Sequence, residues 1–204
     1  MIHRTRHRWH HSGHLFCSLW LVGVMLLGCT ERQTSPDAPP PSSSAESPPP
    51  IDPALLAFLS RARAAHHRAD AFEEKSQLPR ALEELGRILD GPRPHAAQPY
   101  VEVGEVLADT RARMADLRSR LGDHDAALRD VEAGLQLAPG QTYFRGHLFE
   151  VRGLVEERRA KALSKAGDAE AAEQARERAL AAFEQAMRIQ EKVIRKAAPV
   201  ENAP

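Results

Sequence analysis

Cysteine is nearly missing from this 204-residue chain, which contains only Cys17 and Cys29. Both lie near the N-terminus, so the rest of the chain has no cysteine for a disulfide framework and must be stabilised by packing. Aromatic residues make up only 5% of the sequence, whereas Ala, Leu, Glu and Arg are abundant. This composition is typical of helical proteins and favours a single α-helical domain.

A net charge of one sign is also missing, because 28 Lys and Arg residues balance 28 Asp and Glu residues. A chain that began at Cys29 would keep 25 basic residues against the 28 acidic ones. A weakly acidic domain without clustered basic residues argues against nucleic acid as a partner.

Sequence motifs of catalysis are absent as well. From Cys29 onward there is no GxSxG, no glycine-rich phosphate loop and no HExxH. His66 and Asp70 stand four residues apart on one helix face, but two ligands do not make a selective metal site. We therefore predict no enzymatic activity, no cofactor and no metal site.

Residues 1–28 have the pattern of a secretory signal. Arg4, Arg6 and Arg8 occur without any acidic residue and precede an apolar run of 14 residues, Leu15 to Gly28. The run is short for a membrane-spanning helix, which needs about 20 residues. The five histidines near the start offer a metal-binding tract as an alternative, but a discarded signal has no part in the mature fold.

The sequence Leu26-Leu27-Gly28-Cys29, directly after the apolar run, resembles a bacterial lipobox. The resemblance implies that the Cys29 thiol receives a diacylglyceryl group and that Cys29 becomes the new N-terminus after cleavage. Thr30 stands where an inner-membrane retention signal has Asp, which implies the outer membrane of a Gram-negative cell, facing the periplasm. Acyl chains contribute about 0.8 kcal/mol per buried CH₂ and would hold the protein at the bilayer. An ordinary cleaved signal and an uncleaved anchor are the alternatives.

The segment 29–50 contains the lipidated Cys and a stretch rich in Pro and Ser. It cannot bury enough apolar surface to offset its ordering entropy, so we expect a disordered, extended linker. In a polyproline-like form it would reach up to about 65 Å at ~3.1 Å per residue. A proline ligand for an aromatic groove, at Pro39, Pro40 and Pro41, is the alternative.

Apolar residues recur at helical spacing throughout 51–197, which indicates one helical domain. The spacing and the Gly and Pro stops predict helices from Asp52 to a break at Ser76, from Leu78 to Gly91, from about Gln98 to Leu121, from the Gly122 turn to Pro139, from about Thr142 to Ala166, and from about Ala169 to Lys196. Asp52 and Pro53 form an N-cap and first-turn pair. The tail 198–204 is expected to be disordered.

The breaks at Ser76, Gly122 and Gly167 are 46 and 45 residues apart. Alanine stands seven residues before and five residues after each break, as Ala69 and Ala81, Ala115 and Ala127, and Ala160 and Ala172. This pattern, strongest from Leu121 to Pro139, resembles the tetratricopeptide repeat, a helix-turn-helix unit of about 34 residues whose small residues let paired helices approach. The resemblance implies an all-α fold in which about three antiparallel helix pairs stack as a short α-solenoid. The first helix of each pair is longer than the family's by about three turns.

The third unit departs from the repeat spacing. Its better match, ALAAFEQAM, lies one heptad later and contains Ala179, Leu180, Phe183, Ala186 and Met187. Because seven residues return to almost the same helix face, we expect both registers to bury the same stripe. We expect the long last helix to close the stack as a cap.

In the resembled family, the first helices of the pairs line a groove that binds a peptide or a partner helix. Mapped from the breaks, the groove residues are Arg63, His66, Asp70, Glu73, Asp109, Asp116, Arg120, Glu157, Lys161 and Lys165. The mapped groove is acidic toward the first unit and basic toward the third. The Lys and Asn pattern with which chaperone-binding members clamp a C-terminal carboxylate is missing. A merely solvated face is the alternative.

Two other charged features are expected to be structural. His124 opens the helix after the Gly122 turn and is expected to pack with its polar tip outward. The run Glu156-Glu157-Arg158-Arg159 is expected to form an exposed helix surface with local charge pairs rather than a docking patch.

These features predict a membrane-anchored, periplasm-facing scaffold that binds an unidentified protein partner in envelope assembly, secretion or pilus biogenesis. That range of processes rests on analogy with envelope lipoproteins that carry such repeats. A structural homo-oligomer that pairs through the long C-terminal helix is one alternative. A metal-binding envelope protein, suggested by the histidines, is the other.

Overall fold

Helices account for all the regular structure that the computed structural model describes, which covers residues 52–95 and 99–198. They are α1 (Pro53–Glu74), α2 (Leu78–Asp90), α3 (Val101–Arg120), α4 (His124–Leu137), α5 (Tyr143–Lys165) and α6 (Ala169–Ala197). The prediction of an all-α fold is confirmed. The predicted signal peptide, the lipidation site at Cys29, the linker and the tail from residue 199 lie outside the described residues.

Polar N-caps fix the starts of four helices. The Asp52 carboxylate accepts a hydrogen bond from the Ala54 amide at 2.8 Å, as its position before Pro53 predicts. Asp123, Asp168 and Thr142 cap α4, α6 and α5 in the same way. These caps satisfy backbone donors that have no partner inside the helix.

The start of α3 differs from the prediction, since the helix begins at Val101 rather than near Gln98. Pro99 explains the difference, because a proline disfavours helical geometry in the residue before it. Tyr100, at the N-cap, donates its hydroxyl hydrogen to Asp52 Oδ2 at 2.6 Å. This hydrogen bond lowers the pKa of Asp52 and ties the start of α3 to the start of α1.

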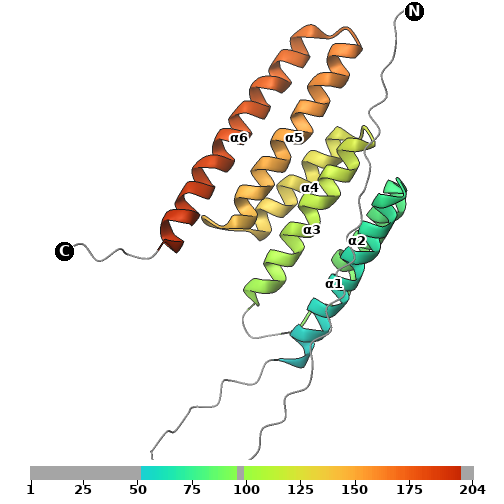
Figure 1. The fold of residues 1–204 in the computed structure, drawn as a ribbon, viewed down its shortest axis with the longest axis vertical. Coiled ribbons are helices and arrows are strands. Elements are labelled where there is room, and N and C mark those ends of the chain that lie inside the picture. The colour runs from blue at the N-terminus through green and yellow to red at the C-terminus, as the bar shows by residue number, and fades with distance from the viewer. Residues whose placement is uncertain (1–51, 96–98, 199–204) are drawn as a thin grey trace, which may run out of the picture. The chain divides into compact units, whose positions relative to one another are not determined.

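Consecutive helices pack as three pairs, α1 with α2, α3 with α4, and α5 with α6, and α5 and α6 lie side by side in Figure 1. A three-residue turn joins the two helices of each pair. The middle residue of each turn has a positive φ: 56° at Ser76, 88° at Gly122 and 86° at Gly167. The residue at each of the three predicted breaks therefore has the left-handed backbone conformation, and two of these three residues are glycines.

Exchanging the residue types at two of these turns is expected to change stability in opposite directions. Gly122→Ala should cost about 1 kcal/mol, because an L-residue is strained at this φ while nothing lies near the added methyl group. Ser76→Gly should stabilise the protein by less than about 1 kcal/mol, because glycine's larger unfolded-state entropy offsets part of the relieved strain. Urea unfolding of the full chain, followed by helical circular dichroism, measures both. A Gly122→Ala variant as stable as the parent would contradict this reading.

The alanines that flank the breaks lie inside the paired helices, as predicted. Each of the six is at most 2% exposed: Ala69, Ala81, Ala115, Ala127, Ala160 and Ala172. Gly153 shows how close the third pair is, because a Cβ there would lie 2.5 Å from the Phe183 ring. Small side chains therefore set the spacing of the helices.

The pairs contact one another in chain order. Helix α3 contacts α1 and α2, and α5 contacts α3 and α4, while the first and third pairs do not touch within the described residues. One core cluster joins the first pair to α3, and a second joins α3, α4 and α5. The first helices of the pairs are thus neighbours in the order α1, α3, α5.

Helix α6 corrects one prediction. Its buried residues are Ala172, Ala175, Ala179, Ala182, Ala186 and Ile189. Ala172, Ala179 and Ala186 thus share one buried stripe, as predicted for the two registers, but Leu180 and Met187 of the later match are exposed. Among the described helices α6 packs against α5 alone, and it therefore buries a single, mostly alanine face. No helix among the described residues combines the length and the apolar character needed to span a bilayer.

Candidate functional site

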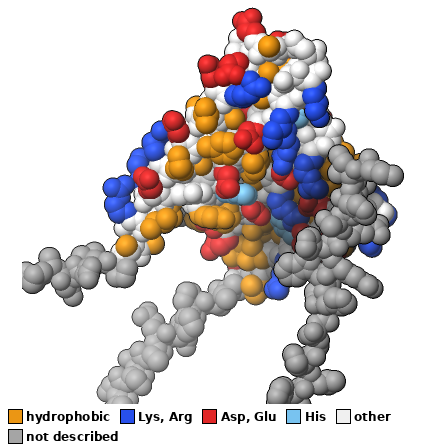
Figure 2. Space-filling model, turned by 45° about the horizontal axis from the view of Figure 1, so that its top comes forward, with side chains coloured by type: hydrophobic (Ala, Val, Ile, Leu, Met, Phe, Trp, Pro, Cys, Tyr) orange, Lys and Arg blue, Asp and Glu red, His pale blue; other side chains and the backbone are white. Residues whose placement is uncertain are grey.

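A groove crosses α1, α3 and α5, with α3 between the other two helices, and we call it the inner groove. It has a volume of about 520 Å³ and is lined by Asp70, Glu73, Glu74, Ala112, Arg113, Asp116, His147, Val151 and Leu154. The apolar members come from α3 and α5, and the acidic ones from α1 and α3. Figure 2 shows acidic and basic side chains interspersed over the helices, with hydrophobic side chains between them.

The structure places six of the ten predicted groove residues in or beside this groove. Asp70, Glu73 and Asp116 line the inner groove directly. His66 and Arg120 are hydrogen-bonded to residues that line it. Asp109 is half-buried and raises the pKa of His66, so it too lies near this face.

The other predicted residues do not line the groove. Arg63, Glu157, Lys161 and Lys165 are exposed outside it, and Glu157 approaches only Lys161, at 3.9 Å. The groove lies 2 to 6 residues before the break in α1, 6 to 10 in α3 and 13 to 20 in α5. Because it crosses the helices obliquely, a mapping at equal distances from the breaks fails in α5.

Arg113 of α3 is the centre of an ion-pair network in the groove. Its Nη2 donates to Asp70 Oδ1 at 2.7 Å and to Glu73 Oε1 at 2.6 Å. Burial alone lowers the pKa of Arg113, but the hydrogen bonds and charges of Glu73 and Asp70 outweigh it and raise the pKa. The sequence analysis did not single out Arg113, although it stands three residues before the predicted Asp116.

The network continues from α3 to α5. Arg120 donates to Glu73 Oε2 at 2.9 Å and lies 3.5 Å from Asp116. Arg158 of α5 lies 2.8 Å from Asp116 Oδ1 and donates to Ser119 Oγ at 2.6 Å. Arginines of α3 and α5 therefore neutralise much of the acidic charge predicted at this end of the groove.

His66 is held in one tautomer by the same network. A guanidinium only donates, so His66 Nδ1 accepts from Arg113 Nη1 at 2.9 Å. Nε2 then carries the hydrogen and donates to Thr110 Oγ1 at 3.2 Å, while Thr110 donates to the Val106 carbonyl at 2.7 Å. Burial and the charge of Arg113 lower the pKa of His66, against the opposing effects of Asp109 and Asp70.

This arrangement predicts a loss of stability in mild acid. The unfolded chain binds a proton at His66 near pH 6.5, whereas the folded chain binds it only at lower pH. Stability is therefore unaffected above that pH and falls as the pH drops toward the folded pKa. His66→Gln should lose less stability than the parent between about pH 7 and pH 5, measured by urea unfolding. His67→Gln, at the exposed neighbouring position, is the control and should follow the parent.

Three buried carboxylates pair with arginines between helices. Asp130 is 1% exposed and binds Arg111, at 2.7 Å, and Arg118. Glu84 binds Arg68 and Arg87, and Glu156 binds Arg178 of α6 through both oxygens. Glu84 and Asp130 each stand three residues after a turn alanine, Ala81 and Ala127. The sequence analysis did not single out either residue, although this shared spacing is a signal that could have identified both.

The expectation for the charge run in α5 is wrong for three of its four residues. Glu156 is buried against α6, Arg158 reaches Asp116 of α3, and Arg159 lies 3.0 Å from Asp125 of α4. Only Glu157 is an exposed residue with a local charge pair. The helix lies between α3 and α4 on one side and α6 on the other, so most of its surface is covered.

His124 also differs in part from its expectation. The residue is half-buried, but its Nδ1 is buried without a hydrogen-bond partner among the described residues. Burial, together with the nearby Arg159, lowers the pKa of His124.

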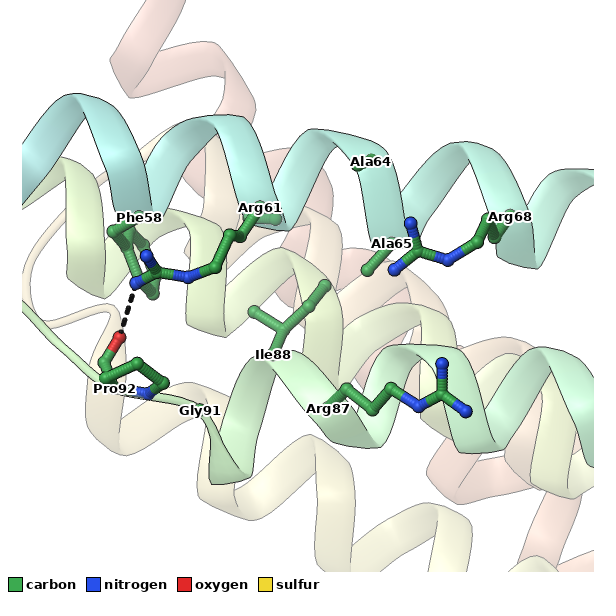
Figure 3. Close-up of a pocket in the computed structure, with 10 residues that line it drawn as sticks. Phe58, Arg61, Ala64, Ala65, Arg68, Arg87, Ile88, Gly91 and Pro92 are labelled. Atoms are coloured by element: carbon green, nitrogen blue, oxygen red, sulfur yellow. Dashed lines mark hydrogen bonds between the residues drawn. The ribbon is translucent and has the colours of Figure 1, made fainter.

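A second hollow, which we call the end pocket, lies between α1 and α2 and has a volume of about 280 Å³ (Figure 3). Its apolar lining includes Phe58, Ala62, Ala65 and Ile88, and its rim carries Arg61, Arg68 and Arg87. Arg61 donates to the Pro92 carbonyl at 2.9 Å, while Arg68 and Arg87 share the carboxylate of Glu84. The three arginines of the rim are therefore all engaged by acceptors of the chain itself.

Within the described residues, no group of three His, Cys, Asp or Glu side chains is placed to hold a metal ion. His66 and Asp70 are both engaged by Arg113 instead. Comparison of the chain with protein-family models, curated proteins and solved structures finds no match.

Proposed function

We propose that this chain is a lipid-anchored scaffold of the bacterial envelope whose tetratricopeptide-like helix pairs bind a protein partner in the inner groove. The groove is the observation that supports this function best. It joins an apolar floor of Ala112, Val151 and Leu154 to charged walls, as sites that bind an amphipathic segment do.

The ion pairs within the groove indicate which of its residues remain available to a partner. Asp70, Glu73 and Asp116 already bind arginines of the chain, so they position those arginines more than they attract a partner. Half-buried Leu154 and His147 of α5 are left as the accessible contacts. We propose that a partner helix places apolar side chains against Leu154, beside His147.

Site-specific photocross-linking in the full chain, in native membranes, tests the groove. A photoreactive amino acid at Leu154 should give one discrete adduct with a second protein. The same amino acid at Arg129, exposed on α4 and outside the groove, is the matched control and should give none. Equal adducts from both positions, or no adduct from Leu154, would refute the assignment.

The anchor is tested separately through Cys29. In this proposal the thiol carries the lipid, and the segment 29–50 spans the distance from the bilayer to the helical domain. Cys29→Ser should abolish incorporation of labelled palmitate, whereas Cys17→Ser should leave it unchanged. Palmitate incorporation that survives Cys29→Ser would remove the lipoprotein half of the proposal without affecting the groove.

A further inference from the structure

A row of large apolar side chains lies uncovered along α6. Leu180, Met187 and Ile194 are 64%, 55% and 68% exposed. Each is seven residues from the next, so the three share nearly one side of the helix and span about 21 Å at ~1.5 Å per residue. Single exposed apolar residues are ordinary, but a continuous row marks an interaction surface.

The equivalent residues of the earlier pairs are covered by the helix that follows. They pack into core clusters that contain residues of α3 or α5, and they are Leu82 and Leu89 in α2 and Leu128 and Leu135 in α4. Leu180 and Met187 occupy these positions when the third unit is aligned one heptad later. No helix follows α6 among the described residues, so Leu180 and Met187 have no such cover there.

We propose that this row binds the same row of a second copy of the chain, with the two α6 helices antiparallel. A two-fold axis beside Met187 places Leu180 of each copy opposite Ile194 of the other, because both lie seven residues from Met187. Met187 then faces its own counterpart. Each side chain of the row meets an apolar one, and the pairing does not depend on the lipid anchor.

The charges beside the row select the antiparallel direction. Glu177 and Arg195 are 18 residues, or about five helical turns, apart, so they lie on the same side of the row. Glu177 stands ten residues before Met187 and Arg195 eight after it, so the two-fold rotation brings each beside the other in the second copy. Both are exposed and form no ion pair within the described part of the chain. Parallel pairing would instead place the two copies of each residue on opposite flanks of the contact, so Glu177 and Arg195 would not meet.

A second charge pair fits the same arrangement. Arg188 follows Met187 by one residue, and Glu184 precedes it by three, so Arg188 of each copy lies near Glu184 of the other. Within one copy these two side chains are 3.6 Å apart, at more than half exposure. Contact with a second copy would therefore add charge pairs at the rim without burying an unpaired charge.

Cysteine cross-linking tests the dimer and its direction. The full chain with Cys17→Ser and Cys29→Ser has no other cysteine. Met187→Cys in this background should form a disulfide-linked dimer on mild oxidation, because helices with axes ~8–10 Å apart bring facing residues within disulfide reach. Leu180→Cys alone and Ile194→Cys alone should form no disulfide-linked dimer, whereas a mixture of the two should form one.

Gln174→Cys, exposed on α6 but outside the row, is the matched control and should form no disulfide-linked dimer. Circular dichroism shows whether each variant is folded, so that a missing cross-link counts against the proposal. A folded Met187→Cys chain that forms no disulfide-linked dimer would overturn the proposed dimer. Self-linking of Leu180→Cys as efficient as that of Met187→Cys would overturn the antiparallel direction.

Discussion

Replacement of Asp130 by alanine is expected to destabilise the helical domain by about 3–5 kcal/mol. The Asp130 carboxylate is 1% exposed and binds both Arg111 and Arg118 of α3, whose side chains are 30% and 31% exposed. Without it, two largely buried guanidinium groups lose their counter-charge and their hydrogen bonds. The cost of that unpaired charge outweighs the desolvation saved by removing the carboxylate.

Urea unfolding, monitored by helical circular dichroism, measures this loss. Glu132→Ala is the matched control on the same helix, because Glu132 is exposed and lies 3.4 Å from Arg152. It should change the free energy of unfolding by less than about 1 kcal/mol, the usual limit for a surface pair. A loss at Asp130 no larger than that at Glu132 would show that the buried ion pair does not hold α3 to α4.

The second large effect is expected at Leu148, the fully buried residue by which α5 fills the space beside Gly134 of α4. Leu148→Ala should cost about 2–5 kcal/mol, from lost burial and the cavity left behind. A Cβ at Gly134 would lie 2.5 Å from a Leu148 methyl group, so Gly134→Ala alone should also destabilise.

Combining the two substitutions tests whether they act at one contact. In the Leu148→Ala background, the methyl group that Gly134→Ala adds enters the space left by the Leu148 side chain. Gly134→Ala should then cost much less than in the parent, because the helix preference of alanine, about 0.5–1 kcal/mol, opposes the one close contact that remains, with Arg111 Cβ at 3.2 Å. Equal effects of Gly134→Ala in both backgrounds, measured by urea unfolding, would contradict a close approach of α4 and α5 at this glycine.

The features that sequence reasoning identified correctly are local. The cap at Asp52, the turns at Ser76 and Gly122, and the alanines around the turns each depend on residues within a few positions of one another. Helical periodicity fixes such contacts, because a helix presents every third or fourth residue to one side.

The features that it missed depend on which helices become neighbours. Arg113 and Arg158 reach carboxylates 40 and 42 positions away, and nothing in the local pattern of α3 or α5 names those partners. Asp130 interrupts an apolar stripe, a pattern compatible with either a solvated or a buried carboxylate. The oblique path of the groove likewise follows from how the helices are displaced against one another, which is why Lys161 and Lys165 were misplaced.

Leu180 illustrates the converse case. Its apolar character and spacing match those of the covered Leu128, so the sequence predicted burial for both. Burial needs a following helix as well as an apolar side chain, and the described chain provides that helix only for Leu128. The terminal unit of a stack is therefore where periodicity alone misleads.

Radical footprinting of the unmodified chain tests the proposed binding face most directly, because it reads the groove residues without altering them. Oxidation of His147 and Leu154 is compared between native membranes and the purified protein. A partner in the inner groove predicts lower oxidation of both residues in native membranes, with no change at Leu56, which is exposed on α1 and outside the groove. Equal oxidation of His147 and Leu154 in the two preparations would contradict the account.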